Sequence, residues 1–168
     1  MPGKRIYLSL GSNIGAREEH LDAALAALER ERVHVLARSS IYETEPQDVV
    51  QQPWFLNMVV ECETSRFPLQ LLALLLSVER KLGRVRNAGL PRRGPRVIDL
   101  DILLFGNVVM ETPQLTIPHP RMLERRFVLE PLLEIAPELR HPATKEPLVG
   151  YLGKVKGQKL RLMRPPSR

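Results

Sequence analysis

Hydrophobic side chains recur along this chain with spacings that predict alternating strands and helices. Residues 5–10 alternate apolar and other side chains, which predicts a strand with one apolar face. Residues 17–31 repeat apolar side chains at intervals of three and four, which predicts an amphipathic helix. The segments 33–44 and 56–63 are rich in residues that favour strands, and we expect them to pair with each other. A glycine-containing loop over 11–15 separates the first strand from the first helix.

The second half of the chain continues the alternation. Pro68 suits the first turn of a second helix, which is expected to end before Gly83, because proline favours helix starts and glycine favours helix ends. A strand is predicted over 97–105, then a turn into a short strand near 108–110, and a short helix over 127–135. This order predicts an α+β fold, a ferredoxin-like βαββαβ sandwich with additional C-terminal strand and helix elements.

Length and charge divide the 168-residue chain into two parts. Its mass of 19.2 kDa fits one domain, which we place at residues 1–153. Residues 154–168 carry six of the 25 lysines and arginines and no acidic residue, so the net charge of +6 comes from this basic C-terminal tail. The tail is expected to be solvated, and a contact with nucleic acid or an anionic membrane is the alternative.

Several classes of protein are excluded by composition. The single cysteine, Cys62, rules out an intramolecular disulfide and a cysteine-based zinc cluster. No apolar stretch approaches the roughly 18 residues of a membrane span, and the apolar run at residues 6–10 is too short for a signal peptide. We therefore expect a cytoplasmic protein. We also expect it to be a monomer and to bind neither nucleic acid nor membrane.

Two carboxylates share one face of the predicted strand 97–105. Asp99 and Asp101 are two residues apart, so their side chains point the same way with Cα atoms about 6.6 Å apart. The other face is expected to take Ile98, Leu100, Ile102 and Leu104. Neighbouring carboxylates suit Mg²⁺, which shares its coordination with waters and substrate phosphates. An ordinary exposed strand face is the alternative.

Basic side chains gather immediately before this strand. Residues 80–96 contain no acid, and glycines and prolines mark 83–95 as a loop. The arginines of the loop are Arg84, Arg86, Arg92, Arg93 and Arg96. Guanidinium groups bind phosphate oxygens bidentately, and a loop lets several converge on one polyanion. The loop by itself also fits a solvated connection or an RNA contact, but together with the two aspartates it predicts a metal–phosphate site.

Common nucleotide and hydrolase signatures are missing from the chain. There is no G-x-x-x-x-G-K-[ST], G-x-G-x-x-G, H-E-x-x-H or G-x-S-x-G motif. Taken alone, His119 indicates a structural turn residue rather than a catalyst, and Phe55 fits a core position. The function must therefore be sought in the combination of motifs.

Seven short motifs follow one another in a characteristic order. They are Gly11-Ser-Asn, Tyr42-Glu-Thr-Glu-Pro46, Phe55-Leu-Asn57, Gly83-Arg-Val-Arg86, Gly94-Pro-Arg96, Asp99-Leu-Asp-Ile102 and Pro118-His-Pro-Arg121. Over residues 6–137 this order resembles the 6-hydroxymethyl-7,8-dihydropterin pyrophosphokinase family of folate biosynthesis. The resemblance implies a ferredoxin-like fold with extra elements. It also implies an enzyme that uses ATP and a reduced pterin alcohol and yields AMP and the pterin diphosphate.

The resemblance also implies the site residues. Asp99 and Asp101 resemble the carboxylates that hold two Mg²⁺ ions, and these two with Arg84 and Arg96 are the implied catalytic residues. The implied ATP-binding residues are Leu72, Glu79, Arg84, Arg86, Arg92, Arg96, Ile102, Leu115, Thr116, His119 and Arg125. The implied pterin-binding residues are Thr44, Gln47, Phe55, Asn57 and Phe127. The loops 45–54 and 84–95 are expected to close over the ligands.

Two positions depart from the family pattern. Arg93 stands where some members carry a tryptophan that helps to close the site, and Pro120 replaces a tyrosine of some members. The loop 87–95 is slightly longer than usual, and the segment beyond residue 150 lies outside the resemblance.

Two functions from other classes compete with this interpretation. An RNA-binding module on a similar sheet would need an aromatic recognition run that the chain lacks. A small phosphatase-like enzyme on the same fold would hydrolyse an acyl or phosphoryl bond without a pterin acceptor.

Overall fold

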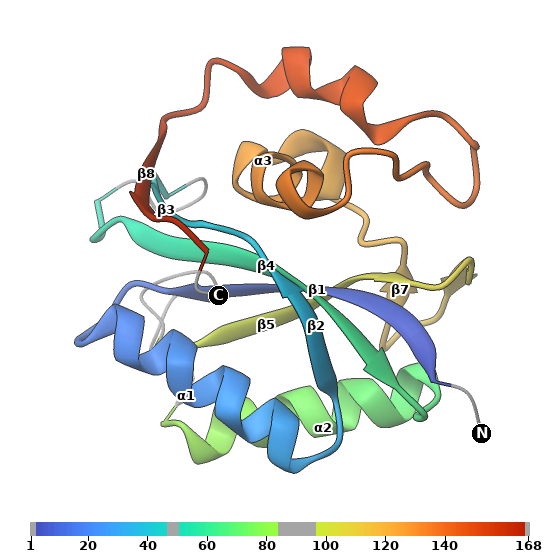
Figure 1. Cartoon of the computed structure of the whole chain (residues 1–168), viewed down its shortest axis with the longest axis horizontal. Coiled ribbons are helices and arrows are strands. Elements are labelled where there is room, and N and C mark those ends of the chain that lie inside the picture. The colour runs from blue at the N-terminus through green and yellow to red at the C-terminus, as the bar shows by residue number, and fades with distance from the viewer. Residues whose placement is uncertain (1–2, 47–50, 84–96, 167–168) are drawn as a thin grey trace.

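Most of the strands join one antiparallel sheet whose two faces are covered by helices (Figure 1). The computed structural model describes residues 3–46, 51–83 and 97–166. In chain order these contain β1 (Lys4–Ser12), α1 (Arg17–Arg30), β2 (His34–Arg38), β3 (Ile41–Thr44), β4 (Phe55–Thr64), α2 (Pro68–Lys81), β5 (Asp99–Phe105), β6 (Met110–Glu111), β7 (Thr116–Ile117), η1 (Met122–Glu124), α3 (Arg126–Ile135), η2 (Leu148–Val155) and β8 (Leu160–Arg164). The main sheet has the order β5-β1-β4-β3-β8, and β2 also pairs with β4. Strands β6 and β7 pair only with each other.

Alternation along the strands produces two hydrophobic cores, one on each face of the sheet. The first core packs β1, β4 and β5 against α1 and α2, and it contains Leu8, Leu25 and Leu75. The second core lies under α3, η1 and η2 and contains Val59 and Leu132. The predicted α+β class is therefore confirmed. Apart from the segment 33–44, each predicted helix and strand is present within the described ranges with small shifts at the ends.

The segment predicted as one strand over 33–44 is divided into β2 and β3. The side chain of Ser39 explains the break, because its hydroxyl oxygen accepts the Val59 backbone N–H at 2.9 Å. The same hydroxyl donates to the carbonyl of Ser40 at 2.7 Å. The Ser39 hydroxyl thus takes the place of a backbone carbonyl as acceptor of the Val59 N–H, while the Ser39 N–H still donates to the Val59 carbonyl at 2.9 Å. Both serines are buried.

Leu104 lies on the opposite face from the one that alternation predicts. The pairing of β1 with β5 shifts register between Tyr7 and Leu8, so that Leu8 faces Ile102 while Tyr7 faces Leu104. The extra residue, Leu103, makes a bulge that reverses the alternation. Leu104 therefore packs in the second core with Tyr7, whereas Leu100 and Ile102 stay in the first core as predicted.

Residues 160–164 of the predicted solvated tail form β8, in which the side chains of Arg161, Leu162 and Met163 are exposed. This strand extends the sheet by pairing with β3, with Arg161 opposite Glu43. Arg164 also forms an ion pair of 2.8 Å with Glu18 of α1. The end of the described chain is therefore part of the sheet, while the domain boundary at residue 153 stays a prediction.

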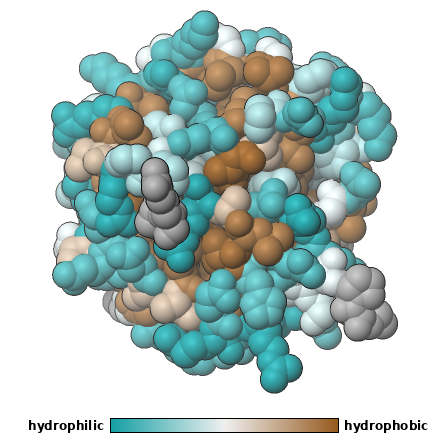
Figure 2. Space-filling model, in the orientation of Figure 1, coloured by the Kyte–Doolittle hydropathy of each residue, from teal (hydrophilic) through white to brown (hydrophobic). Residues whose placement is uncertain are grey.

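Polar surface dominates the face seen in Figure 2, where hydrophobic side chains occur between hydrophilic ones. In the described ranges, no helix combines the length and apolar character that crossing a membrane requires.

Candidate active site

The predicted metal and pterin residues meet on one face at one end of the sheet. In the strand registers, Gly11 of β1 lies between Asp99 of β5 and Asn57 of β4, and Ser9 lies opposite Asp101. Residues directly opposite each other in an antiparallel sheet point to the same face. Because Leu100 and Ile102 face α1 and α2, the two aspartates and Asn57 face the α3 side. The structure therefore brings together residues that are more than 40 positions apart in sequence.

Asn57 is held in place before any ligand arrives. Its Nδ2 atom donates a 2.6 Å hydrogen bond to the Thr44 hydroxyl oxygen, and both residues are buried. Phe55 lies opposite Thr44 in the pairing of β3 with β4. Three of the predicted pterin-binding residues thus form one contiguous group. The second N–H and the carbonyl oxygen of the Asn57 amide are the groups that suit recognition of a ring edge.

Gly11 is a residue of this site that the site prediction omitted. A Cβ atom at this position would lie 2.6 Å from Asn57 Oδ1 and 3.6 Å from Phe55 Cδ1. Glycine therefore permits the close approach of β1 to the amide that is expected to recognise the ligand. The signal was present in the sequence, because Gly11 opens the first of the seven family motifs.

The two aspartates offer carboxylate oxygens, which are ligands that Mg²⁺ takes in proteins. Both side chains are half-buried, and they alternate with buried Leu100 as predicted. Among the described residues, no group of three or more His, Cys, Asp or Glu side chains is arranged to hold a metal. The pair by itself is compatible with Mg²⁺, which is usually bound by one or two carboxylates together with waters and phosphates.

Glu79 has a structural contact that the sequence did not predict. It is 2% exposed, and its carboxylate accepts the backbone N–H of Leu100 at 2.8 Å. Leu100 lies between the two aspartates, so this bond fixes the start of β5 against α2. The predicted contact of Glu79 with nucleotide stays a prediction.

We expect Glu79→Ala to lower the melting temperature by about 5 °C, because it leaves the buried N–H of Leu100 without its carboxylate acceptor. Thermal unfolding followed by circular dichroism measures the change. Glu79→Gln keeps an acceptor oxygen and should recover most of the loss, and equal losses in the two variants would contradict this role.

The other predicted ATP-binding residues surround β5, which is an edge strand of the sheet. The backbone N–H of His119 donates to the carbonyl of Leu103 at 2.9 Å. Arg125 lies 5.4 Å from the ring centre of Phe127 at the start of α3. Leu72, Ile102 and Leu115 belong to the first core or pack against it, and Thr116 lies in β7. The remaining predicted site residues, Gln47, Arg84, Arg86, Arg92 and Arg96, lie outside the described residues.

Residues 7–137 match the family described as 7,8-dihydro-6-hydroxymethylpterin-pyrophosphokinase (HPPK). The chain belongs to this family. It is 51% identical to the 2-amino-4-hydroxy-6-hydroxymethyldihydropteridine pyrophosphokinase of Bacillus subtilis over 139 residues, which cover 82% of this chain and 81% of that protein. The corresponding Pseudomonas aeruginosa protein is 44% identical over 83% of this chain and 85% of its own length.

Larger relatives contain this unit as one part. The folic acid synthesis protein fol1 of Schizosaccharomyces pombe is 46% identical over 95% of this chain, and the chain spans 21% of that protein. A crystal structure of an HPPK-DHPS in complex with substrates has a TM-score of 0.72 at 16% identity, covering 92% of this chain and 43% of that one. A Plasmodium falciparum HPPK-DHPS variant gives the same TM-score over 90% of this chain and 45% of its own. At such identity the structural likeness concerns the fold.

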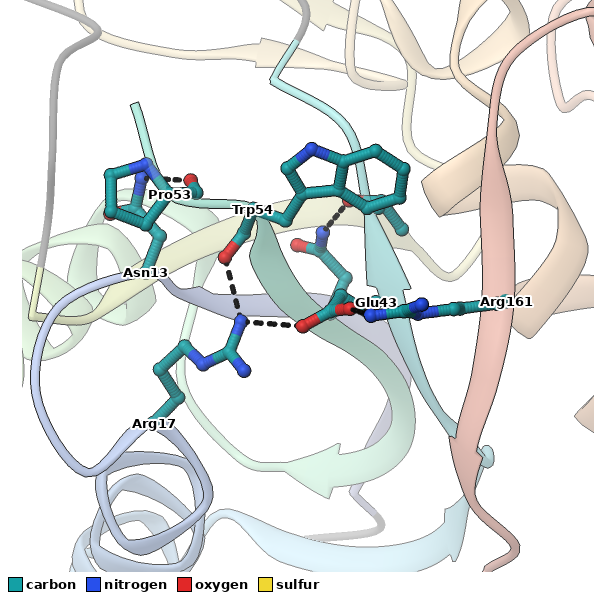
Figure 3. A network of polar contacts seen from close by, with 8 residues as sticks. Asn13, Arg17, Glu43, Pro53, Trp54 and Arg161 are labelled. Carbon is teal, nitrogen blue, oxygen red and sulfur yellow. Dashed lines mark hydrogen bonds and ion pairs between the residues drawn. The ribbon is translucent and has the colours of Figure 1, made fainter. Parts of the chain in front are cut away.

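A polar network at the same end of the sheet includes a residue from outside the matched span. Figure 3 shows Arg17 of α1 between the carbonyl of Trp54 and the carboxylate of Glu43, and Arg161 of β8 reaching Glu43 from the opposite side. Arg17 Nη1 lies 2.8 Å from the Trp54 oxygen and 2.9 Å from Glu43 Oε2. Arg161 Nε donates to Glu43 Oε1 at 2.8 Å. Sequence reasoning did not predict this network, because its members come from four separate segments.

Glu43 is a buried carboxylate stabilised by two arginines. Burial raises its pKa, but the hydrogen bonds and charges of Arg161 and Arg17 outweigh burial and hold the pKa below the ordinary 4.5. The ionised carboxylate therefore stabilises the fold at neutral pH, and this stabilisation is lost as pH falls through the lowered pKa.

We expect the free energy of unfolding to decrease as the pH falls below the ordinary carboxyl pKa of 4.5, with a contribution from Glu43. Glu43→Gln should be less stable than the wild type at pH 7 and lose less stability as the pH falls. Urea unfolding at several pH values measures both effects, and an unchanged slope in the variant would contradict the assignment.

Proposed function

We propose that this chain transfers the pyrophosphoryl group of ATP to the hydroxymethyl group of 6-hydroxymethyl-7,8-dihydropterin and yields AMP and the pterin diphosphate. Family membership and 51% identity over most of the length of the B. subtilis pyrophosphokinase support this activity. The structural observation that carries it is the gathering of Asp99, Asp101 and Asn57 on one face of the sheet.

The pterin is bound beside Gly11, where the sheet offers an amide and aromatic side chains. Asn57, oriented by its bond to Thr44, hydrogen-bonds to the edge of the ring. Phe55 and Phe127 stack on the ring faces, since flat aromatic ligands favour such contacts. Gln47 contributes from the adjoining loop. This binding holds the hydroxymethyl oxygen for in-line attack on the β-phosphorus, with AMP as the leaving group.

The triphosphate is bound by basic side chains. Arg84, Arg86, Arg92 and Arg96 bind phosphate oxygens, together with His119 and Arg125. Arg84 and Arg96 stabilise the charge that develops as the bond to the leaving oxygen breaks. The base and ribose lie against Leu72, Glu79, Ile102, Leu115 and Thr116. Closure of the loops 45–54 and 84–95 excludes water that would otherwise hydrolyse ATP.

Asp99 and Asp101 are the residues that would hold two Mg²⁺ ions. When bound, these ions supply neutralisation of phosphate charge and polarisation of the reacting oxygens. Without a third protein carboxylate among the described residues, the two aspartates leave coordination positions for waters and phosphate oxygens. Asp101 also orients the attacking hydroxyl.

The decisive assay combines the protein, ATP, Mg²⁺ and hydroxymethyldihydropterin and measures AMP. AMP should form only when the pterin is present and in equal amount to the pterin diphosphate. Phosphate release from ATP without pterin would favour the phosphatase alternative. Absence of any nucleotide reaction with tight RNA binding would favour the RNA-binding alternative.

The fold and organisation proposed from the sequence are compatible with this activity. What supports a ferredoxin-like arrangement is the strand order β5-β1-β4 with β2 and β3 beyond, and α1 and α2 on one face. A catalytic domain over 1–153, a monomeric state and a cytoplasmic location stay predictions.

A further inference from the structure

We propose that Arg161 is a positioning residue for the pterin side of the active site. It lies in β8, beyond the residues 7–137 that match the family. It acts through Glu43 and Arg17 on the segment 51–54, which leads directly into Phe55 and Asn57. This inference rests on the proposed function, since it concerns the pterin-binding role of those two residues.

The network connects Arg161 to Arg17 through a single carboxylate, that of Glu43. Arg161 Nε donates to Glu43 Oε1 at 2.8 Å, and a second nitrogen of the same guanidinium contacts the same oxygen. The other oxygen, Oε2, receives Arg17 at 2.9 Å. The two arginines therefore fix the carboxylate from opposite sides, and removing one of them lets it rotate.

Arg17 connects this carboxylate to the backbone next to the pterin site. The same Nη1 atom that contacts Glu43 also donates to the carbonyl oxygen of Trp54 at 2.8 Å. Residues 51–54 form no strand pairs, and side-chain hydrogen bonds from Arg17 and Asn13 connect this segment to the rest of the protein. Asn13 adds two such contacts, to Gln52 Oε1 at 2.7 Å and to the Pro53 carbonyl at 3.0 Å.

The two residues that the network holds, Trp54 and Glu43, are each adjacent to a predicted pterin-binding residue. Trp54 precedes Phe55, and Glu43 precedes Thr44, whose hydroxyl orients the Asn57 amide. Glu43 lies opposite Leu56, which faces the first core, so the network supports β3 and β4 from behind the pterin face. A shift of either strand end displaces the groups that would contact the ring. Small displacements of positioning groups in an active site can lower the reaction rate strongly.

Arg161 is suited to this role because it contributes little to the hydrophobic cores. Its side chain is 70% exposed, whereas that of Glu43 is 9% exposed. The guanidinium also lies 5.8 Å from the centre of the Trp54 ring. A cavity of about 330 Å³ is lined by Glu43, Trp54 and Arg161.

The test compares Arg161→Met with Arg164→Met, a matched control in the same strand. Arg164 pairs with Glu18 and Asp22, so its ion pairs go to α1 and not to the segment 51–54. Steady-state kinetics should show that Arg161→Met raises the KM for pterin about tenfold and changes the KM for ATP less than twofold. Arg164→Met should leave both values within twofold of wild type. Arg161→Lys should recover part of the loss, because it restores the charge but not the forked contact.

A second measurement does not depend on turnover. Trp54 is the single tryptophan of the chain, so acrylamide quenching of the protein's fluorescence reports on the segment 51–54 directly. Arg161→Met and Glu43→Gln should both increase the quenching constant, and Arg164→Met should not. Circular dichroism melting accompanies each variant, so that a general loss of folding is recognised.

The outcomes separate this inference from the proposed function. If the wild type forms no AMP, the proposed function fails, while the quenching comparison still tests the link from Arg161 to Trp54. Wild-type pterin KM and wild-type quenching in Arg161→Met would overturn the inference. Equal rises in both KM values, or the same changes in Arg164→Met, would show general stabilisation by β8 and would overturn it as well.

Discussion

Replacing Asp99 or Asp101 by asparagine is expected to lower turnover about 1,000-fold, equivalent to about 4 kcal/mol in the activation free energy. Asparagine keeps the shape of the side chain but removes the charge that attracts a divalent cation. Both aspartates lie on the face that carries Asn57, so the loss should concern Mg²⁺-dependent ATP binding and turnover. Titration with a non-hydrolysable ATP analogue, with and without Mg²⁺, measures the binding component.

A matched control separates this effect from a general change of charge. Glu138→Gln removes an exposed carboxylate that lies between α3 and η2 and should leave both affinity and turnover unchanged. All three variants should melt within a few degrees of the wild type, because the aspartates are only half-buried. Unchanged affinity for Mg²⁺-ATP in Asp99→Asn would refute the metal assignment.

Substituting alanine for Gly11 should raise the KM for pterin between about 10- and 100-fold, which corresponds to the roughly 1–3 kcal/mol of one displaced polar group. The added Cβ atom would lie 2.6 Å from Asn57 Oδ1, so the amide has to move from the position that Thr44 fixes. The KM for ATP should change much less. Steady-state kinetics with each substrate varied in turn gives the two values.

A double-mutant cycle tests whether the effect acts through the amide. In an Asn57→Ala background there is no amide to displace, so Gly11→Ala should cost less than about threefold. Gly150→Ala is the control, because a Cβ atom there meets no other atom within 4 Å. If Gly11→Ala is equally harmful with and without Asn57, the steric explanation is wrong.

The local elements of this protein were predictable because their signals are local. Periodicity of three and four residues placed α1, and alternation placed β1 and the start of β5. Pro68 and Gly83 marked the limits of α2, which begins at the proline and ends two residues before the glycine. At Gly83 the backbone has a φ of 99°, a conformation that glycine adopts readily. Such signals depend on residues within one or two turns of one another.

Elements that depend on distant partners were not predictable in the same way. β8 is a five-residue strand within a basic segment, and its Arg161 pairs with Glu43, 118 positions earlier. Nothing in the short sequence of β8 indicates this partner. The bulge at Leu103 likewise arises from the pairing with β1, so the face of Leu104 could not be read from alternation alone.

The sequence by itself identified the family through its ordered motifs, and it predicted the chemistry of the site from the aspartate pair and the arginine-rich loop. The tertiary structure alone decided that Gly11 lies against Asn57, that Glu79 supports the backbone between the aspartates, and that Arg161 reaches Glu43. The physical reason is that side-chain alternation is set by neighbouring residues, whereas strand register and buried ion pairs are set by segments that meet only when the chain folds.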